Sequence, residues 1–196
     1  MKIPCTTIVR MGHITRGWHN ELDPVFRTIR LEDGRALCTD RKLMVIERVQ
    51  SVTGTHHLLI DDALMEQCRV ESQFASVLEL VAIPGAVIGK TTMGFATGNL
   101  AYSGSTTGFD DWRAVVSEAA EPLTASSGVM TWDTDTIARL GAASPSGVIE
   151  FARYVDAMAR ATLVRDISTH DWLGLFHPKV VDGVARSGAV VPGWVL

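Results

Sequence analysis

WDTDTIARL (132–140), VIEFARYVDAMARATLV (148–164) and DWLGLFHP (171–178) are the three consecutive segments on which the fold of this chain depends. In the first, Asp133 or Thr134 can accept the free N–H groups of a helix that ends near Gly141. In the last, Trp172–Phe176 has the composition of a strand, and Pro178 ends it because proline has no N–H to donate. A helix followed by apolar segments and a closing strand predicts an α+β unit.

The middle segment has two interpretations. As a helix, it places an apolar stripe at helical spacing (Val148, Phe151, Val155, Met158 and Thr162). As strands, residues 148–155 and 162–164 would flank a turn near Asp156. Its Ala, Met, Arg and Glu content favours the helix by local propensity, and the strand alternative stays open.

A β-meander is predicted over residues 26–49. Phe26–Leu31 alternates apolar and polar side chains, as a half-buried strand does. Asp33-Gly34 supplies the positive φ of a hairpin turn. Ala36–Thr39 and Leu43–Val49 are the second and third strands.

The remaining elements are predicted from local composition. Asp61 or Asp62 can cap a helix from Ala63 to about Val70. Gly12–Asn20 is predicted to be a loop. The other expected strands are Thr6–Met11, Leu58–Ile60, Val77–Ile83, Ala86–Ile88 and Met93–Ala96.

The polar, proline-bearing stretch Ser117–Gly128 is typical of a linker. It predicts a β-rich domain over residues 1–120 and a smaller α+β unit with an apolar tail over residues 121–196. Asp61-Asp62 followed by Asp111-Trp112, and Asp133 followed by Asp171-Trp172, suggest a weak internal repeat. In that repeat, Trp112 and Trp172 would occupy equivalent positions.

Composition limits the possible functions. The 196 residues carry 18 Lys and Arg against 22 Asp and Glu, so the net charge of −4 gives no global attraction to nucleic acid. Three cysteines without CxxC spacing predict buried reduced thiols rather than a disulfide framework or a zinc site. No apolar run approaches the ~20 residues that cross a bilayer. We therefore expect a soluble, cytoplasmic protein.

No motif for catalysis or for a cofactor is convincing. GAVIGKT (85–91) has three residues between its glycines, where a phosphate-binding loop needs four, so a hairpin turn is favoured. The six histidines lack HxH or HExxH spacing, and no GxSxG occurs. We expect no catalytic residue, no metal and no cofactor.

Three motifs resemble the bacterial-type DNA sliding-clamp family, whose domains repeat a β-α-β-β-β unit. IRLEDGRALCTDR (29–41) is similar to the family's hairpin, GFDDWR (108–113) to the segment that closes a clamp domain, and LGLFHP (173–178) to the last strand. His177 replaces the methionine that the family has there. The resemblance implies an α+β fold of mainly antiparallel sheet with a few short helices.

The resemblance also implies a role on DNA. The chain is too short for a three-domain clamp subunit, so it would be a reduced, phage-type member that contacts DNA or tethers a polymerase, and possible self-association is implied. Candidate DNA contacts are Arg41, Lys42, Arg69 and Arg139. Candidate partner-binding residues are Leu175, Phe176, His177, Pro178 and Trp194. Because acidic residues surround these few cations, strong DNA binding is not expected, and a clamp-like protein that binds other proteins is equally plausible.

We therefore predict a non-enzymatic clamp-like module, with two alternatives. One is a small metal-dependent hydrolase, in which His56 or His170 would converge with carboxylates. The other is an assembly protein that oligomerises through Val191–Leu196, although this tail could equally pack on its own domain. The clamp interpretation requires strands within residues 149–164, and a single long helix there would exclude it.

Overall fold

A computed structural model describes residues 1–15, 24–40, 42–60, 62–83, 86–90, 95–98, 111–120, 134–151, 161–176 and 194–195, with the side chains of 24–25 and of 82–98 left out. Runs of antiparallel strands are separated by single helices or helix pairs through these ranges, so the fold class is α+β. None of the helices in them is long and apolar enough to cross a membrane.

The first half of the chain uses one order of elements twice. The first unit comprises β1 (Lys2–Pro4), α1 (Cys5–Thr15), a short 3₁₀ helix η1 (Pro24–Arg27), β2 (Thr28–Glu32), β3 (Arg35–Thr39) and β4 (Leu43–Arg48). The second comprises β5 (Thr55–Leu59), α2 (Asp62–Ser72), β6 (Val77–Ile83), β7 (Ala86–Lys90) and β8 (Phe95–Gly98). Both are β-α-β-β-β units.

The second half adds α3 (Trp112–Ala120), α4 (Thr134–Ala143), β9 (Ile149–Phe151), β10 (Thr162–Asp166) and β11 (Trp172–Phe176). Helix α4 and the three strands that follow it give the α-β-β-β part of the same unit. The order of elements predicted around residues 132–178 is therefore present.

Antiparallel pairing joins these elements into two sheets. The strand orders are β1-β6-β7-β8 and β5-β2-β3-β4-β11-β10-β9. The two units exchange their first strands, since β1 pairs with β6 and β5 pairs with β2. The pairing of β4 with β11, from Leu43 opposite Phe176 to Glu47 opposite Trp172, makes one sheet from segments more than a hundred residues apart.

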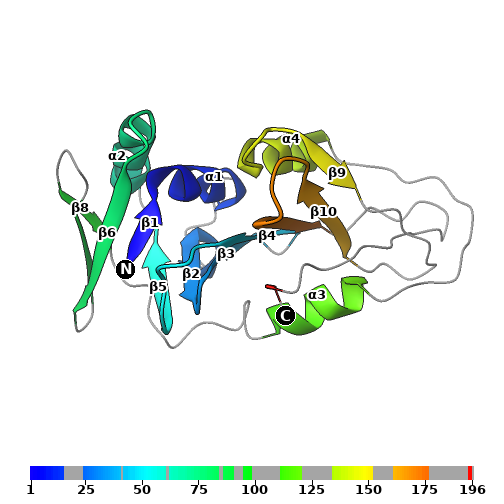
Figure 1. Ribbon diagram of the computed structural model, residues 1–196, viewed down its shortest axis with the longest axis horizontal. Helices are drawn as coiled ribbons and strands as arrows, with labels where there is room; N and C mark the ends of the chain where they lie inside the picture. Colours follow the sequence, from blue (N-terminus) through cyan, green and yellow to red (C-terminus); the bar gives the residue numbers. More distant parts are fainter. Residues whose placement is uncertain are drawn as a thin grey trace, which may run out of the picture.

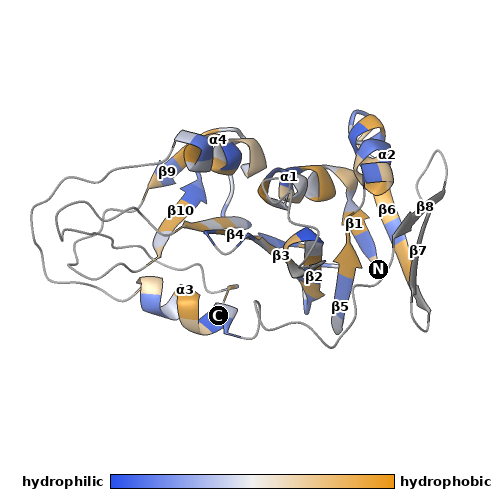
Figure 2. Ribbon diagram, turned by 180° about the vertical axis from the view of Figure 1, so that it is seen from behind, coloured by the Kyte–Doolittle hydropathy of each residue, from blue (hydrophilic) through white to orange (hydrophobic). Residues whose placement is uncertain are grey.

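Helices α1, α2 and α4 lie along one side of the sheets, and α3 lies on the other (Figure 1). We call the side of the seven-stranded sheet under α1 and α4 its inner face, and the side under α3 its outer face. Alternating strand residues supply a core on each: Ile29, Leu31 and Val45 on the inner face, Leu37 and Ile46 on the outer. The hydrophobic colouring of Figure 2 runs through the strands between these helices.

The predicted meander is confirmed as β2, β3 and β4. Asp33 and Gly34 have φ of 38° and 83°, as the hairpin required. β2 begins at Thr28, two residues later than predicted, because Pro24–Arg27 forms the 3₁₀ helix.

Most other predicted elements are also confirmed. Helix α2, strand β6 and strand β11 lie where they were expected, and α4 extends to Ala143, past Gly141. Strand β7 pairs antiparallel with β6, with Ile83 opposite Ala86, so the hairpin favoured for GAVIGKT is supported, while Gly85 and Thr91 lie outside the described residues.

The predicted strand at Thr6–Met11 is wrong, because these residues belong to α1. β-Branched Thr, Ile and Val dominate this stretch and suggested a strand. Cys5, Ile8, Met11 and Thr15 nevertheless recur at helical spacing and are all buried. The predicted loop at Gly12–Asn20 is corrected over Gly12–Thr15, which completes the helix, and the remainder lies outside the described residues.

The single helix favoured for residues 149–164 is corrected at both ends of that range, and residues 152–160 lie outside the described residues. Ile149–Phe151 and Thr162–Asp166 are antiparallel strands, with Val164 opposite Phe151. Thr162–Arg165 pairs on its other side with β11, so sheet hydrogen bonds outweigh the local helical preference. The strands that the clamp interpretation required are present.

Trp112 and Trp172 do not occupy equivalent positions, because Trp112 begins α3 and Trp172 begins β11. The repeat inferred from their Asp-Trp pairs is therefore wrong there, and the repeated unit is the β-α-β-β-β order given above. Ser117–Ala120, predicted as the start of a linker, is the end of α3.

Candidate functional site: the helical layer and the outer face

Two surfaces can carry the function of a clamp-like chain. One is the layer formed by α1, α2 and α4, which carries Arg69 and Arg139, two of the four DNA-contact candidates. The other is the outer face of the seven-stranded sheet, on which α3 and Trp194-Val195 lie.

The described helical layer has no excess of positive charge. Its three helices contain three arginines (Arg10, Arg69, Arg139) against four carboxylates (Asp62, Glu66, Glu71, Asp135) and no lysine. Each arginine is engaged by a carboxylate: Arg10 by Glu47, Arg69 by Glu66 and Arg139 by Asp40. A duplex backbone would therefore find little net attraction here.

Arg139 has a structural task. Its side chain leaves α4 and lies 2.6 Å from the buried carboxylate of Asp40, while Nε donates to the carbonyl of His13 at 3.1 Å. The guanidinium also donates to the carbonyl of Ile14. These carbonyls belong to the last turn of α1, where a helix offers no N–H groups to its carbonyls. Arg139 supplies the donors and therefore caps α1.

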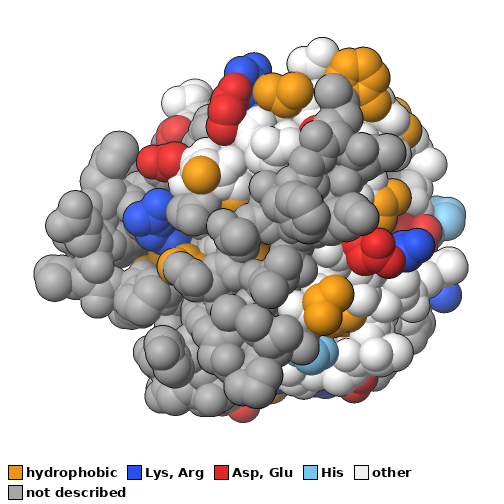
Figure 3. Space-filling model, turned by 90° about the vertical axis from the view of Figure 1, so that its left-hand side faces the viewer, with side chains coloured by type: hydrophobic (Ala, Val, Ile, Leu, Met, Phe, Trp, Pro, Cys, Tyr) orange, Lys and Arg blue, Asp and Glu red, His pale blue; other side chains and the backbone are white. Residues whose placement is uncertain are grey.

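The other DNA-contact candidates are placed differently. Arg69 is exposed and forms a 2.7 Å ion pair with Glu66 on the same helix. Lys42 is exposed, and its backbone N–H donates to Asp40 at 2.9 Å. Arg41 lies outside the described residues. On the end of the molecule shown in Figure 3, some of the coloured Lys and Arg side chains lie against Asp or Glu, at the top and at the right of the view.

The outer face centres on the buried carboxylate of Glu32. It accepts hydrogen bonds from the indole of Trp112 at 3.3 Å and pairs with Arg30 and Arg113, each at 2.9 Å. Burial alone would raise the pKa of Glu32, but the hydrogen bond from Arg113 and the two positive charges outweigh it, so the pKa is lowered. Glu32 is therefore held as an anion that fixes α3 to β2.

Arg35 stands beside this cluster. Its guanidinium lies 5.8 Å from the ring centre of Trp112, while that of Arg113 lies 4.2 Å from the same ring. Burial and repulsion from Arg113 lower the pKa of Arg35, and Glu32 and Asp33 only partly oppose this. The guanidinium remains charged at neutral pH because its ordinary pKa is above 12.

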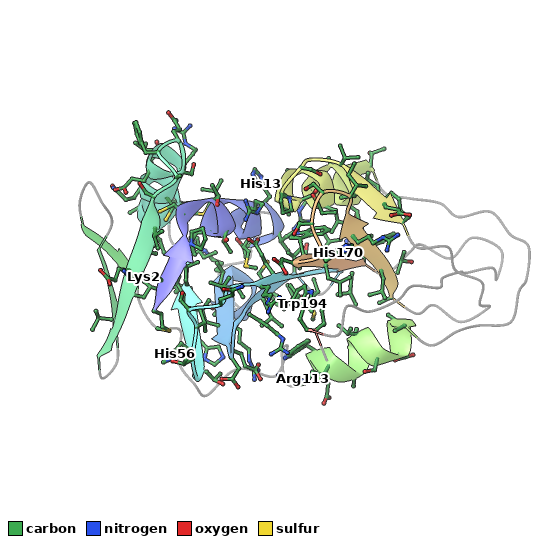
Figure 4. The ribbon with its side chains drawn as sticks, viewed as in Figure 1. Lys2, His13, His56, Arg113, His170 and Trp194 are labelled. Atoms are coloured by element: carbon green, nitrogen blue, oxygen red, sulfur yellow. The ribbon has the colours of Figure 1, made fainter. Side chains whose placement is uncertain are left out.

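Trp194 and Val195 also lie on the outer face. Arg35 Nε donates to the carbonyl of Trp194 at 2.9 Å, and the Trp194 indole donates to the carbonyl of His170. Val195 is fully buried. The interpretation in which the tail packs on its own chain is thus supported for these two residues (Figure 4).

The partner-binding candidates separate between the two faces. Leu175 is buried on the outer face, in one cluster with Val195. Phe176 is buried on the inner face, edge-to-face with Phe151 at 6.1 Å. His177 and Pro178 lie outside the described residues. The sequence did not indicate Arg35 or Glu32, because charged residues in a predicted amphipathic hairpin are usually solvent-exposed.

The alternative of a metal-dependent hydrolase finds no support in the part of the chain that the structure describes. No group of three or more His, Cys, Asp or Glu side chains suited to a metal is found there. His13, His56 and His170 lie on separate parts of the molecule (Figure 4). Cys5, Cys38 and Cys68 are free and buried, as predicted, and burial raises the pKa of each thiol.

Comparison with known proteins identifies the class of fold. No protein-family model matches the chain, and no curated protein sequence matches it. Solved structures do match, and the chain has a divergent form of the DNA sliding-clamp fold.

Three matching structures are the DNA polymerase sliding clamps of Pseudomonas aeruginosa (9% identity, TM-score 0.60) and Bacillus subtilis (12%, 0.56), and a putative DNA polymerase III beta subunit from Eubacterium rectale (8%, 0.58). Each match covers 92% of this chain and 64–66% of the other. The chain therefore spans about two thirds of the length of these clamps. At such low identity the likeness concerns the fold alone.

Proposed function

We propose that this chain is a non-enzymatic, sliding-clamp-like module that tethers replication or repair proteins. The observation that carries the proposal is the charge balance of the helical layer within a clamp fold. The three helices together contain three arginines and four carboxylates, and each arginine forms an ion pair with a carboxylate. A surface of this kind favours contact with proteins over contact with phosphates.

The outer face supports tethering. It combines a buried apolar cluster with tryptophan and arginine, the side chains that most often dominate binding energy at protein interfaces. Leu175 and Trp194, two of the candidate partner-binding residues, contribute to it. Association with DNA through Arg41, Lys42, Arg69 and Arg139 is the weaker proposal. Self-association, a phage-type source and a cytoplasmic location stay predictions.

The test measures binding to protein and to DNA separately. The chain is immobilised and exposed to the purified DNA polymerases of its own genome and, in another channel, to a primer–template duplex at 50 to 200 mM salt. We expect at least one polymerase to bind with a Kd of about 10 µM or tighter. We expect duplex binding to be weaker, with a log–log salt slope of about −2 or shallower.

The opposite pattern would contradict the proposal. Tight duplex binding with a steep salt slope, and no polymerase bound, would assign the chain to DNA. Arg165→Gln serves as the control substitution, since it removes an exposed ion pair with Glu150 and is neither a DNA-contact nor a partner-binding candidate.

A further inference from the structure

Cys5 and Cys68 bring two thiols together from separate units of the fold. Cys5 begins α1 directly after β1, and Cys68 lies on α2, in the second β-α-β-β-β unit. Both side chains are fully buried in one hydrophobic core, and their thiols form a hydrogen bond with each other. The structure describes the reduced form, in which both are free cysteines.

The packing of α1 against α2 holds the two thiols in contact. The helices lie side by side (Figure 1), and a Cβ built on Gly12 would collide with the side chain of Met65, so their backbones approach closely. Cys5 and Gly12 lie along one face of α1, and Met65 and Cys68 along one face of α2, because their spacings are helical. The N–H of Cys5 donates to the carbonyl of Ser76 at 3.0 Å, just before β6. Regular elements therefore fix the position of both cysteines.

The surroundings of the pair affect its rate of oxidation and its equilibrium in opposite ways. Burial raises the pKa of both thiols, and the carboxylate of Glu71 adds to the rise in each. Neutral buried thiols react slowly, because the thiolate is the nucleophile and the core must open locally to admit an oxidant. At equilibrium, however, two thiols held in contact form a disulfide far more readily than two thiols that diffuse freely.

We propose that Cys5 and Cys68 are a site of reversible covalent modification, at which a small-molecule disulfide converts the thiol pair into an intramolecular disulfide. One cysteine thiolate attacks the small-molecule disulfide, forms a mixed disulfide and releases one thiolate. The second cysteine thiolate attacks the mixed disulfide, closes the S–S bond and releases the other. The two released thiolates take up the two cysteine protons, so the oxidant is reduced to two thiols. The inference goes beyond the proposed tethering function and does not depend on it.

The bond locks the exchange of strands between the two units. β1 ends at Pro4, directly before Cys5, and pairs with β6, which follows α2. A link from Cys5 to Cys68 therefore ties the exchanged strand to the helix of the unit that receives it. Cys38 on β3 is an internal comparison, since it is equally buried but its thiol donates to the carbonyl of Met11 at 3.7 Å.

The test determines which cysteines become linked in the folded chain. The protein is equilibrated with mixtures of reduced and oxidised glutathione, quenched with acid, alkylated and digested with trypsin, which places Cys5, Cys38 and Cys68 in the separate peptides 3–10, 36–41 and 49–69. We expect peptides 3–10 and 49–69 to be joined, at the sum of their masses less two hydrogen atoms. In concentrated urea the shorter loops, 5–38 and 38–68, should dominate instead, because the entropy cost of closing a loop rises with its length.

The equilibrium and matched substitutions complete the test. Measured against glutathione, the bond between Cys5 and Cys68 should be at least about tenfold more stable in the folded chain than in urea. By linkage the same factor stabilises the folded state, so the oxidised form should unfold at a midpoint at least about 3 °C higher.

Cys38→Ala should leave the link unchanged and Cys68→Ala should abolish it, with circular dichroism to verify that each variant is folded. Three results with the unsubstituted protein overturn the proposal without any variant. The folded chain stays reduced when the unfolded chain is oxidised, it stops at the mixed disulfide with glutathione, or it links Cys38 as often as it links Cys5 to Cys68.

Discussion

Arg139 shows how a single residue links separate elements of this fold. It extends from α4 to the last carbonyls of α1 and to the carboxylate of Asp40, at the end of β3. Asp40 also accepts the backbone N–H groups of Lys42 at 2.9 Å and Leu43 at 2.7 Å, so it forms the turn into β4 as well. A residue predicted as a DNA contact therefore holds two helices and a turn together.

Replacing Arg139 by alanine should lower the free energy of unfolding by about 3 kcal/mol, because a buried carboxylate would lose its counterion and α1 would lose its cap. Urea denaturation measures this loss. Arg69→Ala, which removes an exposed pair, should change stability by less than about 0.5 kcal/mol. Equal effects of the two substitutions would contradict the structural role of Arg139.

Asp166 should make stability depend on pH. Its buried carboxylate accepts hydrogen bonds from the hydroxyls of Ser144, Ser146 and Ser168 and from the backbone N–H groups of Ser146 and Ser168. Burial alone would raise the pKa of Asp166, but these hydrogen bonds outweigh it and hold the pKa well below its usual range.

Because the folded pKa of Asp166 is below the unfolded value of about 3.9, its stabilisation is present above that pH and is lost as the pH falls below it. Asp166→Asn should therefore cost about 2 kcal/mol at pH 7 and progressively less in acid. Thermal unfolding of the unsubstituted protein and of Asp166→Asn between pH 2.5 and 7 measures how their difference in stability depends on pH. A constant difference over this range would assign the loss to packing instead.

At the scale of an element, the packing of β11 against α4 requires glycine at position 174. A Cβ built on Gly174 would lie 2.9 Å from the Trp172 ring and 3.0 Å from Leu140 Cδ2. Gly174 thus lets α4 approach the strand closely. The helical Gly141 has no such constraint, since its nearest neighbour would be the carbonyl of Gly147 at 3.9 Å.

Gly174→Val should destabilise the protein by about 2–3 kcal/mol, because the extra atoms overfill the space between α4 and β11. Gly141→Ala should be neutral or stabilising by up to about 1 kcal/mol, since alanine favours the helix. Comparison of their melting temperatures tests the close approach. A tolerated valine at 174 would mean that Leu140 moves freely.

At the scale of the whole molecule, the β4–β11 pairing joins strands of the two predicted domains in one sheet. Residues 1–120 and 121–196 were predicted as separate units, yet both contribute strands to one seven-stranded sheet. Five paired positions of β4 and β11 join them, with hydrophobic cores on both faces of the sheet.

We expect the amides of Val45 and Ile46 in β4 and of Leu173 and Leu175 in β11 to share one global opening free energy in native-state hydrogen exchange. This follows if the sheet opens as a single cooperative unit. Exchange of the β11 amides at a distinctly lower free energy would instead support the predicted division into two domains.

The sequence by itself determined the elements whose signals are local. The Asp33-Gly34 hairpin, the meander around it, helix α2 and the strands β6 and β11 follow from turn chemistry and periodicity. Tertiary structure alone decided that Ile149–Phe151 and Thr162–Asp166 are strands, because their hydrogen bonds come from each other and from β11. Tertiary structure also decided that Arg139 donates to the end of α1 and that Arg35 donates to Trp194. These contacts join residues more than a hundred positions apart, so no local sequence pattern predicts them.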